Sequence, residues 1–448
     1  MTDLDHLPGA ARYRVRVLAA AYAISSYGSF LNLVALGLFA FEVTGSGLAT
    51  GLFMALRLGS GFLAAPIAGV LATRYPRRPL MIGSDLLSAA ALIALVAAPS
   101  AAEPVLLYGL ALVLGATQAQ WGVAMRSAVP DLVGLDGRTR ANSQLVTARS
   151  MAMLAGFASA GVLVSQLGFH RTFLVDAASY VVCAALLLAV PLDRAVAAPR
   201  SGSGLAGAEP GQRPGGRPAA EPGEGRSAGG RLGVLRILPA VLVAMVVVRT
   251  ADAFGSASHN VGLPVYANLA APADPAAFAA TFLTAWAVGS LAAGGWLGRR
   301  ARTRELARPE PVFGLATCLM SVFFVLCFTG PPVWLLVPLA AAAGAADGIA
   351  EITYTGRLQG VPDEQRARVF GSAIAAQNAG FGLGMVGCSM LLDVLGPFPV
   401  VAAAHTAALA TAAGFLVLFA RAGSARAGPT RAELPDHSPA GSRLPTPR

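Results

Sequence analysis

Residues 69–80 read GVLATRYPRRPL, where an apolar run ends and three arginines follow, Arg74, Arg77 and Arg78. Residues 295–304, GWLGRRARTR, repeat this arrangement 226 residues later. Arginines gather in the short loops that a membrane protein keeps on its cytoplasmic side. The two stretches therefore predict two apolar segments that each end in a basic loop on the same side of a bilayer.

The composition supports a membrane protein. Of the 448 residues, 55% are hydrophobic and 12% are charged, whereas soluble domains carry about 25% charged residues. The net charge of +10 could indicate nucleic-acid binding, but the arginines lie in short loops and tails and not on one contiguous basic face. We therefore expect a lipid bilayer around the chain and no nucleic-acid partner.

No motif in the sequence indicates an enzyme or a cofactor. All 33 basic residues are arginine, so the phosphate-binding pattern G-x-x-x-x-G-K-[ST] cannot occur. The patterns G-x-S-x-G and H-E-x-x-H are also missing from the sequence. The four cysteines stand singly in apolar stretches, without the spacing of a metal site or a disulfide framework. We expect no catalytic residue, no metal site and no cofactor.

The sequence predicts an all-α membrane protein with twelve transmembrane helices, since each crossing needs about 20 mostly apolar residues. The fifth and eleventh segments are rich in small and amide residues, which is typical of helices that face a protein interior or a water-filled path. The segments are 17–41, 48–72, 79–99, 104–127, 141–167, 171–191, 236–268, 276–298, 311–329, 332–356, 367–392 and 397–420.

Loop charges predict the topology and the division of the chain. Arginines concentrate in alternate loops, which places both termini and the central linker in the cytoplasm and the helices in the cell membrane. Residues 201–230 are rich in Gly and Pro and cannot form a core, so this linker is expected to be disordered. The predicted parts are a cytoplasmic segment (1–16), a six-helix bundle (17–191), the linker (192–235), a second six-helix bundle (236–421) and a disordered cytoplasmic tail (422–448).

Landmarks recur at a nearly constant offset between the two halves. Gly69 and Leu71 match Gly295 and Leu297 at an offset of 226, and the sequence Val-Pro-Asp at 129–131 returns at 361–363. Parallel six-helix repeats with a substrate site between them characterise a class of secondary transporters. The basic loop occurs twice because each half has its own loop between its second and third helices.

These stretches resemble a known family. GVLATRYPRR is similar to the signature G-x-L-a-D-r-x-G-r-R between helices 2 and 3 of the major facilitator superfamily. Within that superfamily, the chain is similar to the drug:proton antiporter branch, which includes siderophore and macrolide exporters. The similar stretches are AVPDLV, RANSQL, GFASAGVLVSQLGF, FLVDAASY and VPDEQRARVFGS. The resemblance implies two pseudo-symmetric six-helix bundles, a monomer and a substrate cavity between the halves.

The signature is altered at two positions, with Thr73 in place of the usual Asp and Pro76 in place of the usual Gly. The resemblance implies that the usual Asp acts as a cytoplasmic latch and meets the start of helix 11. With Thr73 in its place, we expect a weaker latch without charge. The arginines of the loop either serve this gate or only anchor the topology. The predicted cytoplasmic gate comprises Gly69, Thr73, Arg74, Arg77, Arg78, Arg126, Asp131, Arg300, Arg304, Arg357 and Asp363.

Asp347 and Glu351 are four residues apart, on one face of the tenth predicted helix. Two carboxylates that face one cavity repel each other when both are charged, which favours the binding of a proton. Alternatively they pair with arginine, for which Arg357, Arg57 and Arg126 are candidates, and lock the cytoplasmic end.

Asp252 is a third candidate for proton coupling, although Arg249 lies three residues earlier and could pair with it. Arg57 in the second predicted helix is expected to pair with Asp85 or another buried acid. Two more acids near predicted helix ends are expected to act as caps or gate pairs, Asp176 and Asp393.

Polar residues inside the predicted helices suggest a substrate cavity. The resemblance implies that the first and seventh helices line it, and Gln and Trp together give a mixed wall suited to large amphipathic solutes. Each polar side chain could instead form an interhelical hydrogen bond. The candidates are Asn32, Gln118, Trp121, Arg149, His259, Asn260, Gln377 and Asn378.

The sequence therefore predicts a secondary transporter that exports a hydrophobic or amphipathic small molecule, such as a drug, a siderophore or a secondary metabolite, in exchange for protons. The two halves would rock about the cavity between them. Uptake or uniport of a small metabolite is one alternative. A membrane receptor or assembly factor on the same fold is another.

Overall fold

The computed structural model describes residues 9–189, 240–301, 309–361 and 363–426. Within these ranges the side chains of 9–11, 130–140, 142–143, 298–301, 363–368 and 422–426 are left undescribed. The predicted linker and most of the predicted tail lie outside the described residues.

Every described element is a helix, and α4 runs on through the predicted loops at 128–140 and 168–170. The first half contains α1 (Gly9–Thr44), α2 (Gly47–Arg74), α3 (Arg77–Val96), the short η1 (Ser100–Ala102) and α4 (Glu103–Ala189). The second half contains α6 (Ala240–Ala270), α7 (Pro275–Ala301), α8 (Pro309–Cys327), α9 (Val333–Gln359), α10 (Asp363–Leu395) and α11 (Pro397–Arg426).

The long element α4 is folded back on itself and contains three predicted crossings. A straight helix of its 87 residues would be about 130 Å long, several times the thickness of a bilayer. Glu103 and His170 instead lie in contact, with Oε1 and Nε2 3.0 Å apart. Gly168 adopts the left-handed conformation (φ 76°) between the fifth and sixth predicted helices, where the chain reverses.

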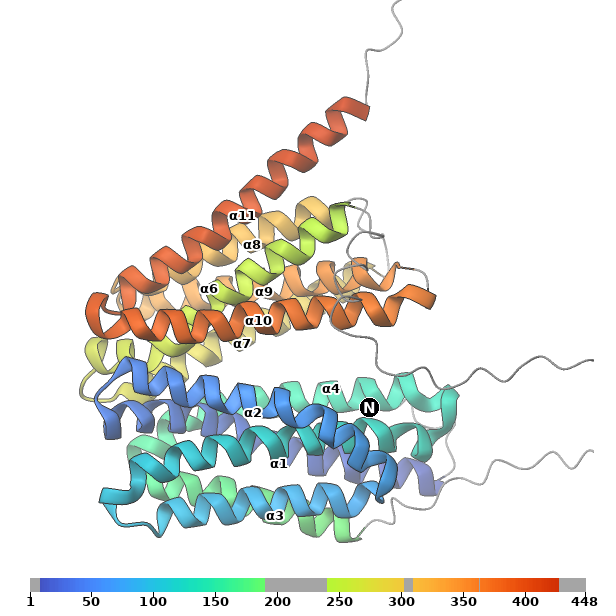
Figure 1. The fold of residues 1–448 in the computed structure, drawn as a ribbon, viewed down its shortest axis with the longest axis vertical. Helices are drawn as coiled ribbons and strands as arrows, with labels where there is room; N and C mark the ends of the chain where they lie inside the picture. Colours follow the sequence, from blue (N-terminus) through green and yellow to red (C-terminus); the bar gives the residue numbers. More distant parts are fainter. Residues whose placement is uncertain (1–8, 190–239, 302–308, 362, 427–448) are drawn as a thin grey trace, which may run out of the picture.

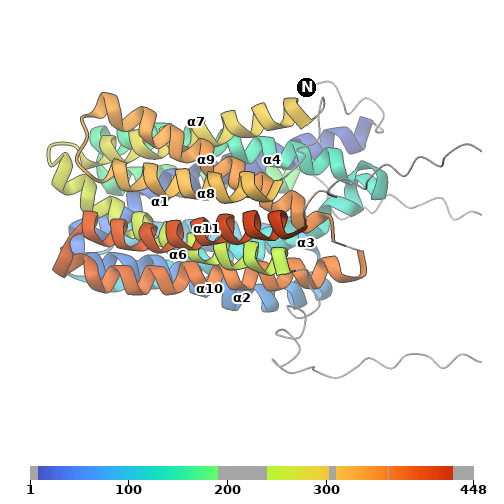
Figure 2. The ribbon, with the colours of Figure 1, turned by 90° about the horizontal axis from the view of Figure 1, so that it is seen from above.

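The described helices thus account for the twelve predicted crossings. Eleven stretches are long and apolar enough to span a membrane, and one of them, Gln144–Ala189, has 46 residues, enough for two crossings. Figure 1 shows the helices of the first half below and those of the second half above. In the view from above, all helices run along a common direction (Figure 2). The predicted fold class, an all-α membrane protein of the two-bundle type, is confirmed.

Small residues let the helices pack backbone to backbone. A Cβ added at Gly289 of α7 would overlap the carbonyl of Ala341 in α9, and one added at Gly344 of α9 would overlap the carbonyl of Trp286 in α7. Close approach at small residues is the usual basis of helix association in membranes, where lipid is as apolar as the side chains.

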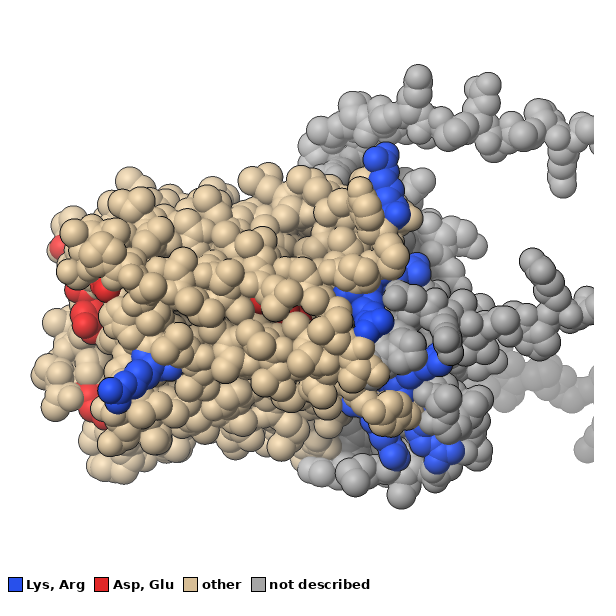
Figure 3. Space-filling model, turned by 90° about the horizontal axis from the view of Figure 1, so that it is seen from below, with Lys and Arg blue, Asp and Glu red and all other residues tan. Residues whose placement is uncertain are grey.

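On the face shown in Figure 3, most charged side chains lie at the two ends of the helix bundle, and the surface between them is largely uncharged. Arg74 in the last turn of α2 and Arg357 in the last turn of α9 lie at one end, which we call the basic end. Glu103 at the start of α4 and Asp274 just before α7 lie at the opposite, acidic end. A largely uncharged middle between two charged ends is the surface expected of a protein that spans a bilayer.

Candidate functional site

A cavity of about 1620 Å³ lies between the two halves. Its wall is formed by α1, α2, α3 and α4 of the first half and by α6, α7 and α10 of the second. The cavity reaches the basic end, because its lining includes Arg126 and Val129 from the end of the first crossing of α4 and Leu145 from the start of the next. It is large enough for a drug-sized molecule.

At the acidic end the halves are joined by hydrogen bonds. Asp393 of α10 accepts hydrogen bonds from Ser46 Oγ (2.6 Å), Gly47 N (2.6 Å) and Leu48 N (3.3 Å) at the start of α2. The first N–H groups of a helix have no partner within the helix and favour a negative charge. The expectation that Asp393 is a cap or gate residue therefore agrees with its contacts.

A second carboxylate joins the halves at the same end. Asp274 accepts hydrogen bonds from Ser165 Oγ of α4, at 2.7 and 2.8 Å, and from Ala277 N of its own helix, at 2.9 Å. Close to it, a Cβ added at Gly161 would come within 2.9 Å of Ala280 Cβ. Asp274 is not among the residues singled out from the sequence, since an acid in a short loop gives no sign of a partner 109 residues away.

Most of the predicted substrate-cavity residues do line the cavity. They are Gln118, Trp121, Arg149, His259, Asn260 and Asn378. Gln377 is not among the lining residues, since it is next to Asn378 on a helix and neighbouring side chains point about 100° apart.

The prediction that Asn32 lines the cavity is not supported by its position. Asn32 is 1% exposed and donates a hydrogen bond from Nδ2 to Asp176 Oδ2 at 2.6 Å. Asp176 is itself fully buried and also contacts Ser179 Oγ. Asn32 and Asp176 therefore fasten α1 to the last crossing of α4, in the structural role that polar residues often have inside a helix bundle.

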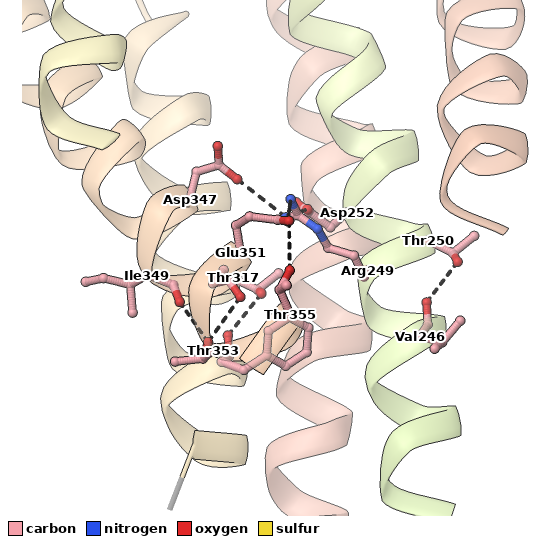
Figure 4. A network of polar contacts seen from close by, with 12 residues as sticks. Val246, Arg249, Thr250, Asp252, Thr317, Asp347, Ile349, Glu351, Thr353 and Thr355 are labelled. Carbon is pink, nitrogen blue, oxygen red and sulfur yellow. Dashed lines mark hydrogen bonds and ion pairs between the residues drawn. The ribbon is translucent and has the colours of Figure 1, made fainter. Parts of the chain in front are cut away.

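The predicted proton-coupling residues meet in one cluster inside the second half (Figure 4). Arg249 of α6 lies between three carboxylates, with its guanidinium nitrogens 2.6 Å from Asp252, 2.7 Å from Glu351 and 3.4 Å from Asp347. Arg249 and Asp252 are buried, whereas the Glu351 side chain is 51% exposed. Of the two predicted alternatives, the structure gives the carboxylates an arginine partner, but that partner is Arg249 and none of the three that sequence suggested.

This cluster holds more acid than base and lies beside the cavity rather than in its wall. None of its four members is among the lining residues. Asp252 Oδ1 and Arg249 Nε are buried without a hydrogen-bond partner. One guanidinium facing three carboxylates leaves an excess of negative charge that a bound proton would relieve.

Several predicted gate residues have other contacts. Arg357 Nε lies 2.7 Å from Glu310 Oε1 of α8. Arg78 donates from Nε to the carbonyl of Leu187 at 2.8 Å and so fastens α3 to the end of α4. Thr73 Oγ1 donates to the carbonyl of Val70, one turn earlier in α2.

The remaining gate residues are placed by the structure as follows. A Cβ added at Gly69 would meet nothing within 4 Å. Arg74, Arg77 and Arg126 belong to the basic end, and Arg126 also lines the cavity. The side chains of Asp131, Arg300 and Asp363, and the whole of Arg304, lie outside the described residues.

The structure pairs the predicted cavity residue His259 with a second histidine that was not identified from the sequence. His259 Nδ1 of α6 lies 3.1 Å from His405 Nε2 of α11, and both rings stack with Phe324 of α8. His405 is fully buried. The sequence signal for this pair is His405, a single histidine in the middle of an apolar segment.

A family model described as "Major Facilitator Superfamily" matches residues 18–359. The chain belongs to the major facilitator superfamily. No curated protein matches this chain in sequence. Several solved structures share the fold.

The nucleoside transporter NupG is 14% identical, with a TM-score of 0.64 over 90% of this chain and 98% of that one. A peptide transporter, POT, in complex with sulfate is 16% identical, with a TM-score of 0.63 over 92% and 95% of the two chains. A bacterial homologue of the human lysosomal transporter Spinster, in an inward-facing and occupied conformation, is 14% identical with a TM-score of 0.60 over 92% and 96%. At these identities the likeness concerns the fold.

Proposed function

We propose that this major facilitator protein exports a hydrophobic or amphipathic small molecule across the cell membrane in exchange for protons. The observation that carries the proposal is Arg249, buried among three carboxylates. In such a cluster one carboxylate can take up and release a proton while the guanidinium holds the other two.

Asp347 is the carboxylate that we assign to the proton. Its 3.4 Å contact with Arg249 is the longest of the three, so protonation of Asp347 disturbs the cluster least. Asp252 is nearly inaccessible at 2% exposure, whereas the Asp347 side chain is 23% exposed. Glu351, the most exposed member, provides a route between the cluster and water.

The transport cycle follows from the closed acidic end and the cavity that reaches the basic end. With the basic end in the cytoplasm, substrate enters the cavity from inside the cell. Rocking of the halves then breaks the contacts of Asp393 and Asp274 and opens the acidic end. Asp347 takes up a proton there as substrate leaves, and releases it to the cytoplasm after the return.

Reconstituted protein tests this proposal. Proteoliposomes would carry a pH-sensitive dye inside and an imposed pH gradient, and hydrophobic drugs, dyes and siderophores would be added in turn. We expect substrate-triggered proton flux, and loss of that flux in Asp347→Asn. Glu310→Gln is the matched control, because Glu310 is also a carboxylate in an ion pair with arginine but lies outside the cluster.

Other functions give different results in the same vesicles. Uptake or uniport of a small metabolite gives substrate movement without substrate-linked proton flux. A receptor or assembly factor gives neither, even though the protein is folded. Proton flux that persists in Asp347→Asn, Glu351→Gln and Asp252→Asn alike would contradict the assignment of the cluster.

A further inference from the structure

The charged side chains in the cavity wall are mainly arginine. Arg57 of α2 and Arg126 and Arg149 of α4 line the cavity. Among the lining residues, Asp85 of α3 is the acid. Among the described residues, none of these arginines has an ion pair with an acid. The expected pair between Arg57 and Asp85 is therefore absent.

The acids near these arginines already have donors. Asp85 Oδ2 accepts a hydrogen bond from Trp121 Nε1 at 3.2 Å. Asp176, which attracts Arg57 electrostatically from behind the wall, is held by Asn32 and Ser179. The Arg57 guanidinium, in contrast, has a buried nitrogen without a hydrogen-bond partner. The wall therefore offers donors and positive charge in excess of acceptors.

One of the arginines lies against α1, and a second lines the same cavity. Arg149 covers the ring of Phe30, with Cζ 5.1 Å from the ring centre. Arg57 lines the same cavity from α2, as Ser29 and Phe30 do from α1. Apolar side chains such as Phe53, Phe62 and Phe381 make up much of the remaining wall.

We infer that the cavity binds organic anions, with the acidic group of the ligand between Arg57 and Arg149 and its apolar part against the phenylalanines. Unpaired arginine is costly at membrane depth unless an anion or water satisfies it. Guanidinium groups form strong, paired hydrogen bonds with carboxylate, sulfonate and phosphate. The inference rests on the proposed transport function and adds to it the charge of the substrate.

A matched pair of dyes tests the inference. Anilinonaphthalenesulfonate and phenylnaphthylamine share the same aromatic body, but only the first carries a negative charge. Binding of each would be measured by fluorescence on the protein in lipid nanodiscs, with empty nanodiscs subtracted. We expect the wild type to prefer the anion by roughly 10- to 100-fold, the range for hydrogen bonds to charged groups.

Substitutions in the wall should remove this preference. Arg149→Gln changes an exposed side chain and so leaves folding intact, Arg57→Gln removes the buried donor, and Arg57→Lys retains the charge. Both Gln variants should bind the two dyes almost equally, and the Lys variant should keep part of the preference. Arg171→Gln, which changes an exposed arginine outside the cavity wall, should bind like the wild type.

Two results would overturn the inference. One is equal binding of both dyes by the wild type, and the other is an unchanged preference in both Arg→Gln variants. The assay needs no transport, so its outcome is separable from that of the flux experiment. Anion preference without proton flux would contradict only the proposed coupling, and proton flux without anion preference would contradict only the anion site.

Discussion

Arg249 is the residue on which the second half most depends for charge balance. Removal of one member of a buried ion pair leaves an uncompensated charge and typically costs about 3–5 kcal/mol. Arg249→Gln would leave three carboxylates without a counter-charge within 4 Å. We expect a loss of stability of this order, measurable as a lower melting temperature in nanodiscs.

A second substitution distinguishes charge balance from packing. Arg249→Gln combined with Asp252→Asn removes one charge of each sign, so part of the lost stability should return. If the double variant melts at or below the temperature of Arg249→Gln alone, the cluster is not balanced in the way that the contacts indicate.

At the residue scale, sequence identified the ionisable residues and the possible pair of Arg249 with Asp252, which lie 2.6 Å apart. It did not identify the arginine partner of Asp347 and Glu351. Asp347, Glu351 and Asp252 were recognised because charges are rare within apolar segments. The suggested partner Arg357 contacts Glu310 instead, because pairing depends on the rotation and height of neighbouring helices. The same unknown rotation explains why Asn32 was placed in the cavity although it is buried against Asp176.

At the element scale, the contact between α7 and α9 depends on glycine. Gly344→Ala would place a Cβ against the carbonyl of Trp286, and the two helices would have to move apart. Overpacking of this kind costs about 1–3 kcal/mol. We expect Gly344→Ala to lower the melting temperature of the protein.

Another glycine of the same helix is the control. A Cβ added at Gly356 of α9 would meet nothing within 4 Å. Alanine favours the helix over glycine by about 1 kcal/mol, so Gly356→Ala should be neutral or slightly stabilising. Equal effects of the two substitutions would mean that close packing is not what holds α7 against α9.

The elements themselves could largely be predicted from sequence. Long apolar runs and arginine-containing loops determine where a membrane helix begins and ends. The turn at Gly168 lies between the fifth and sixth predicted segments, as expected. What sequence could not give is the joint at the acidic end, where Asp393 meets the start of α2 from 345 residues away along the chain.

At the scale of the whole molecule, alternating access requires the acidic end to open. Gly47 and Leu392 face each other across the two halves there, with a Cβ built on Gly47 2.9 Å from Leu392 Cβ. A slight separation would bring the pair into the range of a disulfide. Gly47→Cys with Leu392→Cys should therefore cross-link under oxidation and stop transport, and a reductant should restore it.

The single-cysteine variants are the controls for this cross-link. With the native Cys388 of α10 replaced by serine in all variants, neither can bridge the halves, so both should transport under oxidising conditions as they do under reducing ones. Dye binding from the basic end should survive the cross-link, because the cavity remains accessible there. Full transport by a completely cross-linked protein would show that the halves do not separate at Gly47 and Leu392.

The opposite charges of the cavity and the cluster have an electrical consequence. An anion that leaves through the arginine-lined cavity is electrically equal to a positive charge that enters. Together with the proton that returns on Asp347, each cycle is therefore equivalent to the inward movement of two positive charges. A membrane potential of 100 mV, negative inside, would contribute about 4.6 kcal/mol to such a cycle. Voltage alone could then drive the exchange when no pH gradient is present.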